Sequence, residues 1–158
     1  MIFHTSREIY KAIGRLERQI KKLAAPDPRM EVLQRTTGVG LLDAMTLVSE
    51  IGDISRFPDA CKLCAWAGLT PKVRDSDVSV HHHELTKQGP VAVGWVLVEA
   101  AQTAKRNPRF DDRYDSIRRR LGRQIATVAI ARRLLAPSFH LLKEVGNIAT
   151  GEADRRAG

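Results

Sequence analysis

The sequence is short of aromatic residues and of cysteine. Phe, Trp and Tyr make up 5% of the 158 residues, so a hydrophobic core must consist mainly of Leu, Ile, Val and Ala. The two cysteines, Cys61 and Cys64, form a single CxxC, whereas a structural zinc site usually takes four Cys or His ligands. Their i, i+3 spacing puts both on one face of a predicted helix, and we expect buried, reduced thiols there.

Other patterns are also missing. The N-terminus carries no signal peptide, and no apolar run approaches the roughly 20 residues that span a bilayer, so we expect a cytoplasmic protein with no membrane partner. No stretch alternates apolar and polar residues, and no internal repeat is visible. These absences predict a mainly α-helical domain.

Acidic residues are outnumbered by basic ones. The sequence has 26 Lys and Arg against 18 Asp and Glu, which gives a net charge of +8 and a pI near 10.0. An excess of this size favours a polyanionic partner, with nucleic acid ahead of a membrane surface. A basic surface that only confers solubility is the alternative.

Residues 1–27 are predicted to form an amphipathic, coiled-coil-like helix. Thr5 and Glu8 resemble a capping box that would open it, and Pro26 and Pro28 would end it. Its apolar residues follow heptad spacing, and we call them the seam: Ile9, Ile13, Leu16, Ile20 and Leu23. A helix with so short a seam is marginal alone. It should dock on a second copy or on another part of a larger protein.

Residues 28–145 are predicted to form the main helical domain. A short helix from Met30 leads to Gly38 and Gly40, and a second helix follows over Leu41–Ile51. This pattern is typical of a helix-hairpin-helix, whose backbone amides can face a DNA phosphate. A tight helix corner without DNA contact fits the two glycines equally well.

Further helices are predicted on either side of a polar gap. The helix with the two cysteines should stop at Gly68, and helical pattern resumes over Val91–Lys105 and Phe110–Leu121. A last long helix follows, which Pro137 should kink or break. Residues 146–158 are small and polar and should form a flexible tail.

The polar gap, Gly68–Gly89, concentrates chemically capable side chains, as loops often do. His81–His83 are adjacent, and sequence neighbours do not converge on one metal, so no metal site is predicted here. Ser76 would need a base or a cationic clamp to act as a nucleophile. Candidates for that clamp, which would also contact DNA, are Lys72, Arg74 and Lys87.

The simplest nucleic-acid signal is a basic helix near residue 120. No acid balances the run of arginines, which could neutralise several phosphates. The residues concerned are Arg118, Arg119, Arg120 and Arg123.

From Leu33 to about Val145, the sequence resembles the C-terminal domain of the bridge-RNA-guided insertion-sequence transposases, the "one-ten" family. That family pairs a RuvC-like domain with a serine-bearing transposase domain. The resemblance is carried, in order, by Thr36–Gly40, Glu50–Phe57, Ala67–Pro71, Leu85–Gly89, Leu97–Ala101 and Ile125–Arg132.

The resemblance implies a role for several residues. Ser76 matches the serine that attaches covalently to DNA, and Thr86 and Lys87 match the motif that frames it. It further implies that the N-terminal helix pairs protomers, and that a guide RNA is a partner besides DNA. Magnesium would be bound by the acidic RuvC-like domain, and no cofactor by this chain itself.

Three positions depart from the family pattern: His83, Pro90 and Gly94, the last replacing an Arg. Because Gly cannot mimic a bidentate arginine, we expect a truncated, nucleoid-associated DNA-binding transposase domain with little recombination activity alone. The alternative is a non-catalytic helical module for DNA binding or dimerisation.

Overall fold

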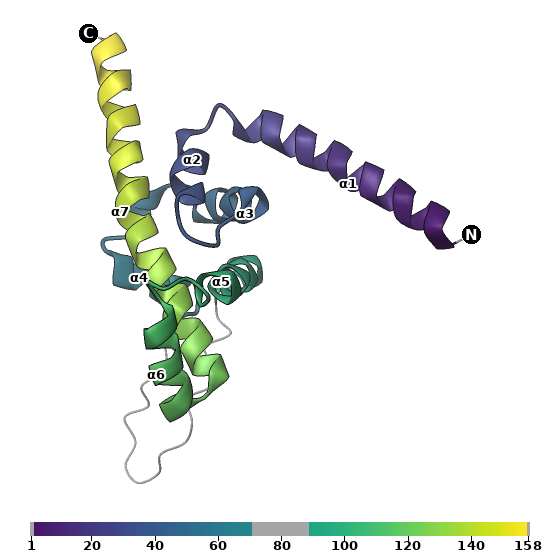
Figure 1. Ribbon diagram of the computed structural model, residues 1–158. Helices are drawn as coiled ribbons and strands as arrows, with labels where there is room; N and C mark the ends of the chain where they lie inside the picture. The colour runs from purple at the N-terminus through teal and green to yellow at the C-terminus, as the bar shows by residue number, and fades with distance from the viewer. Residues whose placement is uncertain (1, 71–88, 158) are drawn as a thin grey trace.

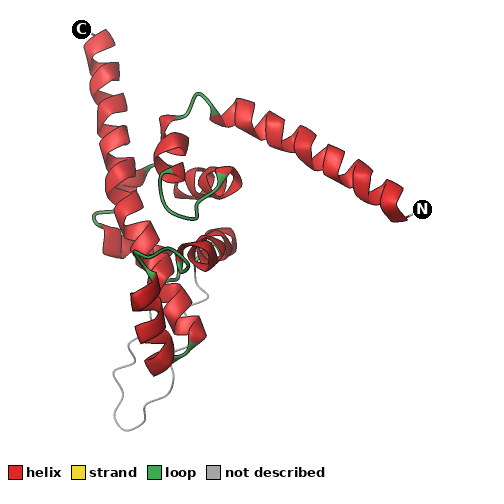
Figure 2. Ribbon diagram, viewed as in Figure 1, coloured by secondary structure: helices red, strands yellow, loops and turns green. Residues whose placement is uncertain are grey.

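Helices make up the regular structure of the computed structural model, which describes residues 2–70 and 89–157, with side chains over 6–70 and 89–146 (Figures 1 and 2). Neither range contains a strand, which confirms the prediction of a mainly α-helical chain. The elements are α1 Ile2–Ala24, α2 Pro28–Gln34, α3 Leu41–Ile51, the 3-10 helix η1 Ile54–Arg56, α4 Ala60–Trp66, α5 Val91–Ala104, α6 Asp111–Leu121 and α7 Arg123–Ala157.

The longest helix, α7, is the centre of the body. It packs against α2, η1, α4, α5 and α6 (Figure 1). Its apolar side chains are buried, among them Ile130, Leu134, Leu135 and Leu142. The core is mainly aliphatic, as the scarcity of aromatics predicted.

The expectation about apolar runs was wrong for α7. Its segment Arg123–Gly146 is long and apolar enough to cross a membrane, and 56% of an 18-residue apolar window within it is buried inside the protein. The apolar residues of α7 face the helices packed around it. Burial against protein therefore accounts for this composition.

Pro137 does not break α7, contrary to the prediction, because α7 continues through it. A proline inside a helix costs roughly 3 kcal/mol. Here the adjacent Leu134, Leu135 and Phe139 are all buried, and packing offsets that cost. The Ser138 hydroxyl is 2.9 Å from the Leu134 carbonyl oxygen and 3.2 Å from the Thr36 hydroxyl, which ties α7 to the segment after α2.

Both ends of the chain are more helical than predicted. α1 begins at Ile2 rather than at Thr5, so the predicted capping box does not open it. α7 continues to Ala157, so residues 146–157 are helical where a flexible tail was expected. A short polar pattern is a weak signal of a helix end, because the neighbouring helix can continue through it.

The arm α1 extends away from the body and contacts it mainly at α3 (Figure 1). Seam residues remain exposed: 54% for Ile9, 44% for Ile13, 58% for Leu16 and 71% for Leu23. The seam thus finds little cover within the described chain.

Asp27 and Arg29 form the joint between arm and body. The Asp27 carboxylate accepts from the backbone N–H of Arg29 and caps α2, which therefore begins before the predicted Met30. The Arg29 guanidinium also donates to both Asp27 oxygens, at 3.0 and 2.7 Å, and to the Gly52 carbonyl at 2.9 Å. These hydrogen bonds with Arg29 lower the pKa of Asp27 below its ordinary value.

The two cysteines do not share one environment. Cys64 is buried and Cys61 is exposed, so the prediction of two buried thiols was wrong for Cys61. Only one side of α4 packs against α7. Cys64 lies on that side, and Cys61, three residues earlier, lies at its exposed edge.

Candidate nucleic-acid interface

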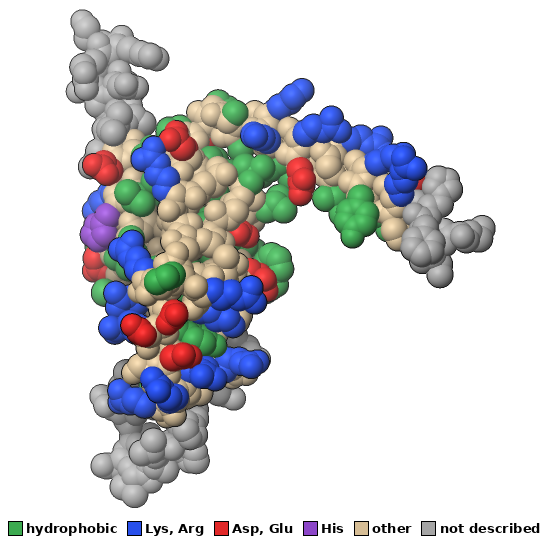
Figure 3. Space-filling view, in the orientation of Figure 1, with side chains coloured by type: hydrophobic (Ala, Val, Ile, Leu, Met, Phe, Trp, Pro, Cys, Tyr) green, Lys and Arg blue, Asp and Glu red, His purple; other side chains and the backbone are tan. Residues whose placement is uncertain are grey.

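Four predicted DNA-binding arginines gather where α6 ends and α7 begins. We call this group the arginine corner: Arg118, Arg119, Arg120 and Arg123. Gly122 makes the corner, with a φ of 89° that favours glycine. All four side chains are exposed, and Lys and Arg side chains gather at that end of the body in Figure 3.

The arginine corner is less unbalanced than predicted. Arg118 pairs with Asp115, at 3.1 Å between Nε and Oδ1, so one charge of the run does have an acidic partner. Arg119 Nε donates to the Asp115 carbonyl at 3.3 Å. Among the described residues, Arg120 and Arg123 have no ion pair. Cations in the last turn also stabilise α6 through its dipole, which is a structural role beside any DNA contact.

Gly38 serves packing. Its φ is 85°, and a Cβ at this position would lie 2.3 Å from the carbonyl oxygen of Ala100 in α5. The segment between α2 and α3 therefore comes so close to α5 that no other residue fits. A tight corner alone explains this glycine.

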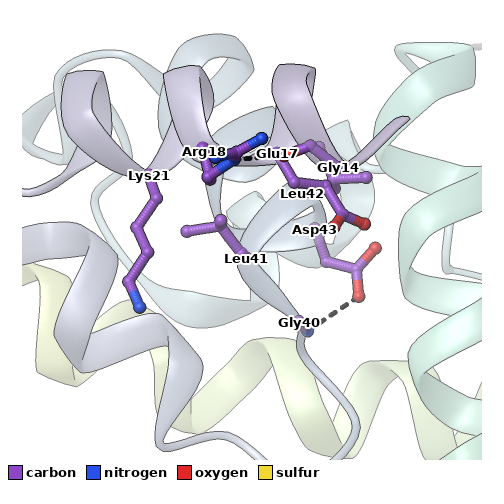
Figure 4. Close-up of a pocket in the computed structure, with 8 residues that line it drawn as sticks. All are labelled: Gly14, Glu17, Arg18, Lys21, Gly40, Leu41, Leu42 and Asp43. Atoms are coloured by element: carbon purple, nitrogen blue, oxygen red, sulfur yellow. Dashed lines mark hydrogen bonds between the residues drawn. The ribbon is translucent and has the colours of Figure 1, made fainter. Parts of the chain in front are cut away.

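Gly40 lies at the N-terminus of α3, and its N–H donates to the Asp43 carboxylate at 2.8 Å (Figure 4). A cleft of about 530 Å³ opens there between α1 and α3. Two acids, Glu17 and Asp43, and two bases, Arg18 and Lys21, line it. Such a balanced lining gives a phosphate little electrostatic attraction. The helix-hairpin-helix therefore stays a prediction, and the geometry favours the tight corner.

The predicted site residues do not form one cluster. Gly38 and Gly40 lie beside α3 and α5, apart from the arginine corner at the end of α6 (Figure 1). His81–His83 lie outside the described residues. So do the residues predicted as nucleophile and phosphate clamp, which are Ser76, Lys72, Arg74, Thr86 and Lys87.

Gly89 and Gly94 flank that segment on the described side. A Cβ on Gly89 would lie 2.6 Å from the Trp66 carbonyl oxygen and 2.8 Å from the Gly68 nitrogen. The chain therefore returns at Gly89 to the place where it left α4. Gly94, in α5, has open space around it, so nothing nearby prevents a larger side chain there.

Metal ligands do not gather in the part of the chain that the structure describes. No group of three or more His, Cys, Asp and Glu side chains lies close enough to hold an ion there. The described residues therefore do not fit a magnesium site.

Sequence reasoning missed one group of arginines. Arg113, Arg132 and Arg133 line a cleft between α4, α6 and α7. α6 and α7 pack against each other, which brings Arg113 near the two α7 arginines. Finding it required the pairing of these helices, which periodicity alone does not specify.

These features define a basic, mainly helical domain with a protruding amphipathic arm. Residues 30–115 match the model of the Transposase IS116/IS110/IS902 family. The chain therefore belongs to that family.

Individual relatives support the assignment. The chain is 36% identical over 74 residues to a 43.6 kDa protein of insertion element IS110 from Streptomyces coelicolor, covering 47% of this chain and 18% of that protein. It is 29% identical over 92 residues to a 44.8 kDa protein of IS116 from Streptomyces clavuligerus, covering 58% and 23%. It is 29% identical over 97 residues to the transposase of IS1111A from Coxiella burnetii, covering 61% and 27%. The chain thus matches about a quarter or less of each relative's length.

Proposed function

We propose that this chain is the DNA-binding, serine-bearing part of an insertion-sequence transposase. The observation that carries the proposal is the family match over residues 30–115, which includes Ser76 and most of its predicted frame. The arginine corner supports DNA binding, because it offers exposed guanidinium groups to phosphates.

Ser76 is proposed as the nucleophile in strand exchange. Its hydroxyl oxygen would attack a phosphodiester phosphorus and give its proton to a base, while the P–O bond to the leaving strand breaks and that oxygen takes up a proton. In the second step a hydroxyl of the incoming strand would attack the phosphorus of the serine–DNA ester. The P–O bond to Ser76 would then break, and the serine oxygen would take up a proton. Lys72, Arg74, Thr86 and Lys87 are proposed to hold the phosphate during this exchange.

The proposed partners follow from the resemblance. They are DNA, a guide RNA and the RuvC-like domain, in a nucleoid-associated, cytoplasmic setting. Magnesium belongs to that other domain in the proposal. No step here is assigned to the metal, because the described residues do not fit a site for it.

The arm α1 is proposed to pair two protomers. Its exposed seam supports this, since apolar side chains at heptad spacing are covered when two such helices associate. The same observation favours the second candidate function, a non-catalytic module for DNA binding and dimerisation.

Covalent trapping tests the proposal and separates the two candidates. The chain would be combined with the RuvC-like domain of an intact relative, its RNA, magnesium and labelled DNA. We expect a protein–DNA adduct, visible on a denaturing gel, that Ser76→Ala abolishes while DNA affinity changes less than about twofold.

Ser55→Ala is the matched control. Ser55 is exposed, and its hydroxyl bonds only to Asp53 in the described structure, so the adduct should persist in that variant. An unchanged adduct yield in Ser76→Ala would remove Ser76 from the mechanism and leave the non-catalytic module.

A further inference from the structure

Three arginines from two helices line one cleft of the body, which we call the arginine cleft. It has a volume of about 310 Å³ and lies where α4, α6 and α7 meet. Arg113 belongs to α6, whereas Arg132 and Arg133 belong to α7. The other lining side chains are Cys61, Cys64 and small or aliphatic residues, and no Asp or Glu is among the described residues that line it.

The charges of the arginine cleft have no ion-pair partner within the described chain, and Arg132 makes a side-chain hydrogen bond with the Cys64 thiol. The four ion pairs present in that part of the protein involve Lys11, Arg29, Arg35 and Arg118, all outside the cleft. Three guanidinium groups around one hollow repel one another, and low-dielectric walls strengthen that repulsion. An anion in the cleft would turn the repulsion into attraction.

The walls of the arginine cleft are built on rigid elements. Arg132 is half-buried and lies beside the buried Cys64 thiol. Burial raises the pKa of that thiol, and the nearby positive charge of Arg132 opposes the rise. The thiol therefore stays uncharged and does not neutralise Arg132. Because all three arginines stand on packed helices, the backbone does not have to become ordered when an anion binds, and the cost is confined to the rotamer freedom of the side chains.

The chemistry of the cleft favours a phosphate. Guanidinium groups bind phosphate oxygens through paired, charge-assisted hydrogen bonds. The described residues of the lining offer no aromatic ring for stacking on a base and no acidic acceptor for a base edge. Such a site holds a backbone phosphate without reading sequence.

We propose that the arginine cleft binds one phosphate of a nucleic-acid backbone whose strand continues to the arginine corner. Arg113 and Arg120 lie two turns apart on α6, roughly 10 Å, which corresponds to about three base-pair steps along the axis of a duplex. This inference rests on the proposed DNA-binding function.

DNA affinity at several salt concentrations tests the nucleic-acid source. The double variant Arg113→Gln, Arg133→Gln removes two exposed charges and leaves the half-buried Arg132 in place. We expect its affinity for a duplex, measured by fluorescence anisotropy, to fall about tenfold near 0.1 M salt. The slope of log affinity against log salt should become shallower by about one, the value for a single lost phosphate contact.

Arg35→Gln is the matched control for charge. Arg35 is the residue that follows the end of α2; it is exposed and is already paired with Glu31. Its affinity should change less than twofold. A second variant, Arg132→Lys, keeps the charge but removes the fork, so it should weaken binding with little change in salt slope.

A second experiment uses inorganic phosphate and does not depend on DNA. At constant ionic strength, phosphate in place of chloride should raise the Tm of the wild-type chain and of Arg35→Gln, but not that of the double variant. If the wild type fails to bind DNA, the proposed function is wrong. The phosphate experiment still decides whether the arginine cleft is a phosphate site.

The remaining outcomes are also decisive. Phosphate stabilisation lost in the double variant, together with unchanged DNA affinity, would overturn the nucleic-acid backbone as the source and indicate a small phosphorylated ligand. If phosphate does not stabilise the wild type and the double variant binds DNA as tightly as the wild type, the arginine cleft is not a phosphate site.

Discussion

The two longest helices, α1 and α7, carry the same kinds of apolar residue and use them in opposite ways. Leu135 of α7 is fully buried, with 0% of its surface exposed, whereas Leu16 of α1 is 58% exposed. Five elements pack against α7, whereas α1 contacts the body mainly at α3. The described body therefore covers the apolar side chains of α7, and it leaves those of the arm exposed.

The largest expected effect breaks the body. Leu135→Ala should lower the free energy of unfolding by about 2–5 kcal/mol, because it leaves a cavity beside α7. Leu16→Ala should change it by less than about 0.5 kcal/mol in dilute, monomeric protein, since Leu16 is already exposed. Urea denaturation followed by circular dichroism measures both. Equal losses would contradict the division into body and arm.

A second pair of variants compares two glycines, one in each region. Gly38→Ala should destabilise the chain by about 2–4 kcal/mol, because the new methyl group meets the Ala100 carbonyl and φ is positive. Gly14→Ala should instead stabilise α1 by about 0.5–1 kcal/mol, since nothing lies within 4 Å of its Cβ position. Thermal unfolding should move in opposite directions, and a harmless Gly38→Ala would contradict the close approach to α5.

The exposed seam gives the third prediction. Leu16→Glu should weaken protomer pairing about tenfold or more, because it puts a charge among apolar side chains that pairing would cover. Leu121→Glu is the control, with 50% exposure at the end of α6 and outside the arm. Sedimentation equilibrium measures the association constant. If both variants pair like the wild type, α1 is not the pairing surface.

The smallest effect concerns the joint between the two regions. Asp27→Asn keeps a side-chain cap for α2 but removes the charge facing Arg29. Because the folded pKa of Asp27 is lowered, its stabilisation is present above the unfolded pKa near 4 and is lost as pH falls through the folded value.

The stability of the wild type should therefore exceed that of Asp27→Asn by less than about 1 kcal/mol at pH 7, because the half-buried pair still contacts solvent, which screens it. The difference should vanish well below pH 4. Urea midpoints across pH measure it, with Glu31→Gln as the control for a more exposed ion pair. A difference in stability that stays constant across pH would show that the charge of Asp27 does not stabilise the fold through Arg29.

Helix existence and bounds were predictable where local signals agreed with burial. The range Leu41–Ile51 was predicted residue for residue, and α5 and α6 differ from their predicted ranges by one residue. Pro137 misled the sequence interpretation, because its cost depends on packing around α7, which is tertiary information.

The candidate site was predictable only in part. Gly122 indicated where the arginine corner lies, since a glycine between two helices favours a turn. The ion pair of Arg118 with Asp115 needed only i, i+3 spacing and could have been predicted. The arginine cleft could not, because helix pairing brings its residues together. Ser76 stood out only through the family resemblance.

The return of the chain at Gly89 to the end of α4 has a consequence for how such proteins diverge. A segment whose two anchors touch can be lengthened, shortened or exchanged at little cost in closure entropy, which grows only slowly with length. The body and the segment between residues 70 and 89 can therefore change at different evolutionary rates. A graft that keeps Gly68 and Gly89 should transfer the segment of one relative to the body of another.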